Sequence, residues 1–179
     1  MRRVSVPSSR VALIGAGASA LVLDLVQHGY RAIEAVDLSR GALDQLGERL
    51  GDAAGVVRLV CADVLDLVFD GQIDVWHDRA TFHFLIDPDD QAKYANRATA
   101  AVRPGGHLII ATFATANGPE HCSGLRVARH SAATLSVRFA EGFDQIEAFG
   151  HDHVTPWGDV QPFTYAIFRR RQLSAEDLR

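Results

Sequence analysis

The chain has 179 residues, about the length of one domain, and it is 47% hydrophobic and 22% charged. That composition supplies a full apolar core and is too hydrophobic for a disordered polypeptide. A net charge of -4, two cysteines, no secretory signal and no bilayer-length apolar run argue against a nucleic acid partner, a membrane and a disulfide framework. We therefore expect one cytoplasmic domain spanning residues 1–179, with its core at about 10–170.

The first part of the chain alternates apolar runs with segments of helical spacing. Four short apolar runs predict buried strands, and the spacing of leucines after the first two runs predicts helices. Serines that can cap helices precede these segments, and glycines that end helices follow them. The expected strands are residues 11–14, 32–36, 56–60 and 73–76, and the expected helices run from Ser19 to about Gly29 and from Ser39 to Gly51.

The later part of the chain changes pattern. A helix at about 89–102 ends at the stop signal Arg103-Pro104-Gly105-Gly106, a strand follows at 107–113, and a short helix lies near 131–139. Residues 143–149 and 161–168 are joined by too few residues for a crossover helix, so they should pair antiparallel. The whole pattern predicts an α/β fold with an open, mostly parallel sheet that ends in an antiparallel hairpin.

A glycine turn follows the first expected strand. The string Gly15-Ala16-Gly17-Ala18-Ser19-Ala20 fits G-x-G-x-x-G/A between a strand and a helix, and Asp37 follows Gly17 by 20 residues. Glycines allow a tight turn and close approach of a ligand to backbone N–H groups, and an acid at the second strand end can accept both ribose hydroxyls. The combination favours an adenosine-type cofactor; glycines that merely relieve crowding are the alternative.

Asp63 lies where the third strand should end, in Cys61-Ala62-Asp63-Val64. Parallel strands end at one edge of the sheet, where the ligand crevice forms, so Asp63 and Asp37 should share that edge. An aspartate there can accept a hydrogen bond from the exocyclic amine of an adenine. The alternative is a capping or turn residue.

Together these strings resemble class I S-adenosylmethionine-dependent methyltransferases over residues 10–170. The Asp74–Leu85 segment, Glu120–Leu125 and Thr155-Pro156-Trp157-Gly158 are similar to the branch that includes the citrate-synthase lysine methyltransferases. The resemblance implies a Rossmann-like, doubly wound sheet of seven strands in the order 3-2-1-4-5-7-6, with strand 7 antiparallel. It also implies S-adenosylmethionine as cofactor, bound by Gly15, Ala16, Gly17, Asp37, Leu38, Asp63, Val64 and Trp76.

By position, the resemblance places the glycines under the methionine part of the cofactor, Asp37 at the ribose and Asp63 with Val64 at the adenine. Trp76 and His77 would lie near the transferred methyl group. His77 and Asp78 are the candidates for a catalytic base or an orienting group, because an imidazole titrates near neutrality. The candidate substrate residues are Arg79, His83 and Cys122, although Asp78 and Arg79 could instead form an internal ion pair.

A metal site is not expected. The side chains of His121, Cys122, His151 and His153 are of the types that bind zinc, but their spacing matches no zinc signature. A substrate-recognition loop is the preferred interpretation of residues 121–123.

Two departures from the family pattern bear on activity. Leu13 stands where class I members usually carry an acid, and about ten residues precede Val11, where this branch usually has a covering segment. The site would then be open, covered by a partner in a possible homodimer, or less active.

The leading hypothesis is methyl transfer to an oxygen, nitrogen or sulfur nucleophile of a small molecule. The alternatives are a protein-lysine methyltransferase, a cofactor-binding domain with reduced or no activity, and an NAD-dependent oxidoreductase.

Overall fold

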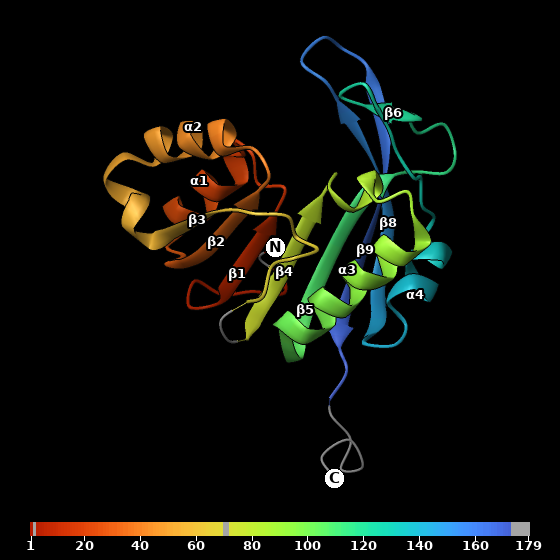
Figure 1. Ribbon diagram of the computed structural model, residues 1–179, viewed down its shortest axis with the longest axis horizontal. Coiled ribbons are helices and arrows are strands. Elements are labelled where there is room, and N and C mark those ends of the chain that lie inside the picture. Colours follow the sequence, from red (N-terminus) through yellow and green to blue (C-terminus); the bar gives the residue numbers. More distant parts are fainter. Residues whose placement is uncertain (2, 70–71, 173–179) are drawn as a thin grey trace.

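A seven-stranded sheet forms the centre of the computed structural model, which describes residues 1, 3–69 and 72–172 (Figure 1). The strand order β3-β2-β1-β4-β5-β9-β8 confirms the expected topology, since β8 and β9 are the sixth and seventh strands of the sheet. The small hairpin β6–β7, which was not predicted, takes two numbers between them. The strands are β1 (Arg10–Ile14), β2 (Ala32–Asp37), β3 (Val57–Cys61), β4 (Ile73–Arg79), β5 (Val102–Phe113), β6 (His121–Cys122), β7 (Leu125–Arg126), β8 (Phe143–Val154) and β9 (Val160–Arg170).

The strand directions follow the prediction, but three strands are markedly longer than expected. The fifth strand begins at Val102 and not at His107, so the predicted stop signal at 103–106 lies within β5. The other two are extended at their ends. The first five strands pair in parallel, and β9 pairs antiparallel with both β5 and β8. The fourth strand continues from Trp76 to Arg79, and β8 continues to Val154, where it pairs with Val160. The extensions of β4 and β8 carry polar side chains toward the edge of the sheet where the parallel strands end.

The helices begin at the side chains that the sequence indicated. Ser19 Oγ accepts a hydrogen bond from the Leu21 amide, and Ser39 Oγ accepts one from the Ala42 amide. The helices are α1 (Ala20–Gln27), α2 (Arg40–Leu50), α3 (Pro88–Ala101) and α4 (Ala132–Phe139), with 3₁₀ turns η1 (Gly51–Val56) and η2 (Phe82–Phe84). Among the described residues, no helix is long and apolar enough to cross a membrane.

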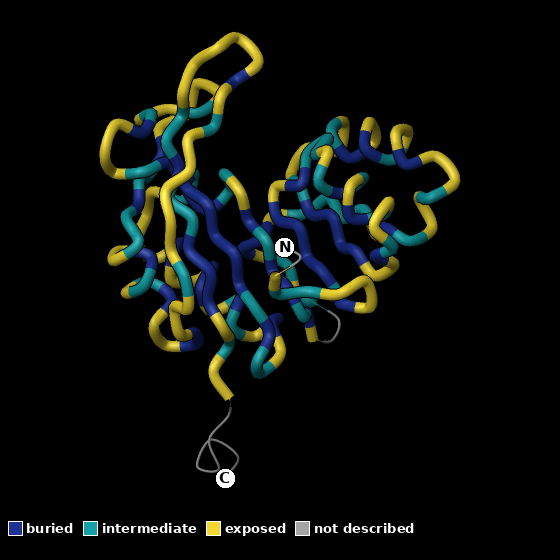
Figure 2. Tube along the Cα trace, turned by 180° about the vertical axis from the view of Figure 1, so that it is seen from behind, coloured by how far each residue is buried: buried dark blue, intermediate teal, exposed yellow. Residues whose placement is uncertain are grey.

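The two faces of the sheet carry different cores. Helices α3 and α4 lie in front of β4, β5 and β9, and their cluster includes Trp76, Tyr94 and Phe139 (Figure 1). The cluster on the other face includes Leu25 from α1, Leu43 from α2 and Val75 from β4. Seen from behind, the strands β5, β9 and β8 have no helix over them in the described part of the chain (Figure 2).

Alternation along β4 divides its side chains between these faces. Trp76 belongs to the α3 and α4 cluster, whereas Val75 belongs to the opposite one. Because successive side chains of a strand point to opposite faces, Asp78 lies on the face of Trp76, and His77 and Arg79 lie on the face of Val75. The fourth strand thus supplies the two faces with different chemistry.

Candidate functional site

A cavity of about 400 Å³ lies where β1, β2 and β3 end. It brings together five of the predicted cofactor residues, from three separate strand ends. This agrees with the expectation that the carboxyl ends of parallel strands form a crevice. The predicted residues that line it are Gly15, Asp37, Leu38, Asp63 and Val64, and the others are Ile14, Val36, Ala62, Ala80, Thr81, Phe84, Leu85 and Leu125.

The Asp37 carboxylate is held in place by backbone amides. Its Oδ2 accepts a hydrogen bond of 2.7 Å from the Gly17 amide, and its Oδ1 accepts one of 2.8 Å from the Ser39 amide. An ionised carboxylate has about four acceptor positions, so these two bonds leave acceptor capacity on each oxygen. Asp37 is therefore both a fixed part of the glycine turn and a hydrogen-bond acceptor on the cavity wall.

Asp63 combines the two roles that the sequence left open. Its Oδ1 accepts a hydrogen bond of 2.8 Å from the Leu65 amide, which stabilises the turn after β3. The same residue is exposed and lines the cavity next to the buried Val64. A turn role for one oxygen therefore accompanies a position from which the carboxylate can meet a ligand.

The glycine turn has a steric reason for its first glycine. Gly15 has a φ of 63°, and a Cβ placed on it would lie 1.7 Å from Thr81 Oγ1. Thr81 Oγ1 also lies 3.3 Å from the Ile14 carbonyl oxygen, to which it donates a hydrogen bond. No side chain can replace the hydrogen of Gly15 without displacing Thr81.

A second cavity of about 410 Å³ lies beside the glycine turn. The two share Ile14 and Gly15 as lining residues. Its other lining residues are Leu13, Ala16, Ser19, Ala20, Leu21, His77 and Arg79. The structure therefore places His77 and Arg79 in one cavity beside the glycine turn.

His77 is a neutral imidazole at ordinary pH. Burial lowers its pKa to about 4, and nearby positive charges, including that of Arg79, act in the same direction. At neutral pH the ring therefore has one nitrogen that donates and one that accepts a hydrogen bond. This state suits a group that orients a nucleophile by a hydrogen bond.

Asp78 does not lie where a catalytic group was expected. Its side chain is fully buried on the α3 face, where Oδ1 accepts a 2.9 Å bond from the Thr81 amide and Oδ2 accepts a 3.0 Å bond from the Phe82 amide. Tyr94 Oη donates a third bond, of 2.5 Å, to Oδ2. Burial raises the pKa of Asp78 to about 6, against the opposing effect of these donors. Asp78 holds the turn after β4 and does not face either cavity.

Trp76 also lies away from the cofactor crevice. It is 0% exposed, and its Nε1 donates a 2.9 Å hydrogen bond to Tyr94 Oη. The prediction placed Trp76 at the end of the fourth strand, but β4 runs three residues further. Because of this extension Trp76 is a core residue, and the strand end is formed by residues 77–79.

His83 and Cys122 do not take the substrate positions predicted for them. His83 is 0% exposed and packs edge-on against Phe84, and neither of its ring nitrogens has a hydrogen-bond partner among the described residues. Burial lowers its pKa to about 4. Cys122 lies in β6 and packs against the cluster that contains Phe113 and Phe163.

The zinc alternative is not supported by the arrangement of its ligands. Across the described ranges, no three His, Cys, Asp or Glu side chains are grouped closely enough to hold a metal ion. His151 and His153 instead face Tyr165 and Phe163 across the β8–β9 pair.

Several lining residues of the first cavity were missed from the sequence as ligand contacts. Thr81, Phe84 and Leu85 come from the turn and 3₁₀ segment after β4. Their position in the sequence could have indicated them, because a segment that follows a parallel strand lies at the same edge of the sheet as the other strand ends.

A family model described as a methyltransferase domain matches residues 13–110. A search among curated proteins returned no match. The solved structures similar to this chain include a SAM-dependent methyltransferase from Methanosarcina mazei, with 15% identity, a TM-score of 0.79 and coverage of 96% of this chain and 97% of that one.

Two other similar structures were solved with S-adenosylhomocysteine bound. The N-methyltransferase NodS from Bradyrhizobium japonicum WM9 has 18% identity and a TM-score of 0.72, over 92% of this chain and 80% of that one. The 1,6-didemethyltoxoflavin-N1-methyltransferase from Burkholderia thailandensis has 22% identity and a TM-score of 0.74, over 92% and 72%. At these identities the likeness establishes a shared fold.

The buried carboxylate gives a first prediction. Replacing Asp78 with Ala removes the acceptor of two buried amides and of Tyr94 Oη, so the free energy of unfolding should fall by about 3 kcal/mol or more. Tyr94→Phe removes the donor to Asp78 and the acceptor of the Trp76 Nε1 hydrogen bond, and should cost about 2 to 3 kcal/mol. Urea unfolding measures both. Lost turnover in Asp78→Ala with unchanged stability would return Asp78 to the catalytic residues.

His83 gives a second prediction, on pH dependence. With a folded pKa of about 4 and an unfolded pKa of 6.5, the folded state binds fewer protons in this window, so stability falls as pH drops through it. His83→Phe should therefore reduce the stability lost between pH 7 and pH 5 by about 2 kcal/mol. Urea unfolding at both pH values, with His121→Phe at an exposed position as control, measures this. An unchanged difference between the two pH values would contradict it.

Proposed function

The chain belongs to the methyltransferase-domain family, and from this premise we propose that it transfers a methyl group from S-adenosylmethionine to a nucleophilic oxygen, nitrogen or sulfur of a small molecule. The observation that carries the proposal is that the two cavities share lining residues at the glycine turn. The cavity lined by Asp37 and Asp63 shares Gly15 with the cavity lined by His77. A cofactor site and a candidate reaction site therefore meet at the glycine turn.

The residues of the crevice fit this cofactor. The Asp37 carboxylate, fixed by two amides, keeps acceptor capacity for the ribose hydroxyls. Asp63 and the Val64 amide would hold the adenine, and Leu38 and Leu85 supply apolar wall on the same cavity. Leu13 lines the second cavity without charge, so the two aspartates carry the polar recognition.

The protein's part in the reaction is to position the acceptor and to manage its proton. S-adenosylmethionine supplies an electrophilic methyl carbon: the acceptor's lone pair forms the new bond while the carbon–sulfur pair stays on sulfur, giving S-adenosylhomocysteine. His77, neutral at pH 7, would accept a hydrogen bond from the acceptor and orient its lone pair. Its low pKa favours an acceptor that is uncharged or already deprotonated over one that must lose a proton to a strong base.

A small-molecule acceptor is supported by the size of the cavities and by the relatives. Cavities of this volume are typical of sites for small ligands. The similar structure from Burkholderia thailandensis is named for methylation of 1,6-didemethyltoxoflavin, and NodS is named as an N-methyltransferase.

The ribose assignment can be tested by calorimetric titration. Asp37→Ala should weaken S-adenosylhomocysteine binding by tenfold or more, since a charge-assisted acceptor is lost. Asp37→Asn retains one acceptor for the turn and should lose less, and the exposed Asp52→Ala serves as control. Unchanged affinity in Asp37→Ala would disprove the assignment, and NAD binding without a response to either sulfur nucleotide would disprove the cofactor.

Methyl transfer itself can be tested with labelled S-adenosylmethionine and a panel of small thiols, amines and phenols. Label should enter at least one class, and His77→Ala should lower that rate at least tenfold, because a badly oriented acceptor loses much of its reactivity. His83→Phe, which changes a histidine outside both cavities, should retain the rate. Equal rates in His77→Ala and the unmodified protein would remove His77 from the mechanism.

A further inference from the structure

A third cavity, of about 520 Å³, lies on the back of the sheet and borders the second one. Leu21, His77 and Arg79 line both cavities. The remaining lining residues are Met1, Asp24, Leu25, His151, His153 and Tyr165. An acceptor in this third cavity would therefore reach the candidate reaction site without crossing the sheet.

This cavity borders an aromatic surface on β8 and β9, from which Tyr165, His151 and His153 line it. The Phe149 and Tyr165 rings stack at 5.1 Å with an interplanar angle of 4°, and His151 meets Tyr165 edge-on at 5.9 Å. Phe163 lies beside them on the same face of β9, in ring contact with Tyr165 and His153. Such a surface favours a planar ring, because aromatic side chains stack on planar ligands.

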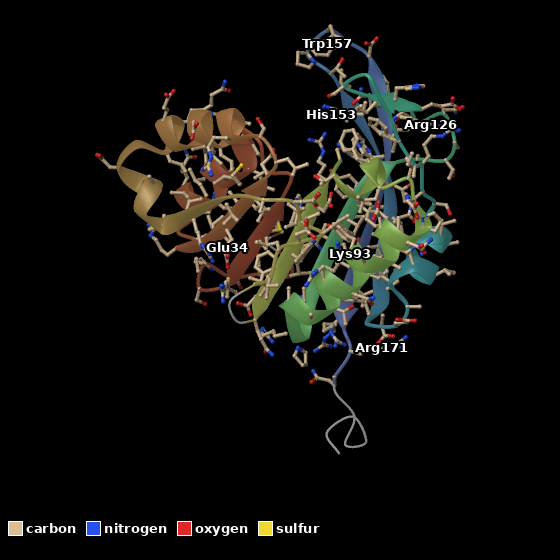
Figure 3. The ribbon with its side chains drawn as sticks, in the orientation of Figure 1. Glu34, Lys93, Arg126, His153, Trp157 and Arg171 are labelled. Carbon is tan, nitrogen blue, oxygen red and sulfur yellow. The ribbon has the colours of Figure 1, made fainter. Side chains whose placement is uncertain are left out.

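This aromatic face is open to ligands. Phe149 is 43% exposed although it is a large hydrophobic side chain, and no helix of the described chain covers β8 and β9 from behind (Figure 2). His153 lies on the long β8–β9 hairpin below its tip at Trp157 (Figure 3). The hairpin forms one wall of the cavity, and α1 contributes the opposite wall through Leu21 and Leu25.

Arg79 gives the third cavity a positively charged side chain. Its guanidinium carbon lies 5.0 Å from the centre of the Phe163 ring, and among the residues that the structure describes no carboxylate lies within ion-pair distance of it. Asp24, the one carboxylate among the described lining residues, lies 3.3 Å from His28 Nδ1. Partial burial and the charge of Arg79 lower the pKa of His153, so the lining histidines affected by Arg79 are neutral hydrogen-bonding groups. The lining therefore places the Arg79 cation beside neutral histidine rings, while the Asp24 carboxylate belongs to the α1 side of the cavity.

We propose that this cavity binds a small aromatic acid as the methyl acceptor, with the acid group on Arg79 and the ring on the Phe149–Tyr165 face. The fork of an arginine matches a carboxylate bidentately, and a stacked ring fixes the plane of the ligand. Residues two apart on a strand are about 7 Å apart, so an acid held at Arg79 leaves a hydroxyl or amino group at the far end of one ring near His77. The role of this acid as methyl acceptor rests on the proposed function, whereas its binding to the cavity does not.

The proposal predicts charge-dependent binding that ligand-observed NMR titration can measure. The probes are 4-hydroxybenzoate and 4-hydroxybenzamide, which differ in the acid group and share the ring and hydroxyl. The acid should bind at least tenfold more tightly, and Arg79→Gln should abolish this difference. Arg171→Gln, at an arginine that pairs with Asp144 at the opposite end of β9, should preserve it. Tyr165→Leu should weaken both probes.

Titrations with and without S-adenosylhomocysteine separate the two proposals. Arg79-dependent binding of the acid without any S-adenosylhomocysteine binding would leave this inference standing and contradict the proposed function. Normal S-adenosylhomocysteine binding with equal affinity for the acid and the amide, or with no effect of Arg79→Gln, would overturn the inference alone. Because Arg79 is exposed, the thermal midpoint of Arg79→Gln should match that of the unmodified protein, so a lost preference reports on binding.

Discussion

The buried carboxylate of Asp78 is the constraint on which the candidate site depends. It accepts hydrogen bonds from the Thr81 and Phe82 amides and from Tyr94, and so bends the chain sharply at the end of β4. Within this bend Ala80 has a φ of 68°, a conformation that residues with a side chain seldom adopt. The bend sets Thr81 against Gly15, so a carboxylate on one face of the sheet determines the form of the ligand crevice at its edge.

The architecture and the crevice could be predicted from the sequence because they depend on order along the chain. Alternating apolar runs and capped helices determine a doubly wound sheet, and parallel strands then end at one edge. Asp37, Asp63 and the glycine turn were assigned to that edge without any knowledge of side-chain contacts, and the structure brings them to one cavity.

Which side chains at the strand ends are buried and which face the site could not be predicted in the same way. The polar residues after Trp76 resembled the beginning of a loop, yet β4 continues through them because Asp78 is paired by buried donors. The sequence carries no sign that Tyr94, 16 positions later on α3, supplies one of these donors. The assignment of Trp76, Asp78 and His83 to the site failed because burial is decided by such partners, which local pattern does not reveal.

The alternation along β4 has a consequence for how this protein can change. His77 and Arg79 face the open side, while Trp76 and Asp78 between them anchor the same backbone from the other side. Substitutions at the first pair alter the chemistry offered to a ligand and leave the anchoring of the strand intact. Anchoring and ligand-facing positions alternate along this strand, so new acceptor preferences can evolve by single substitutions that leave the buried partners of the backbone in place.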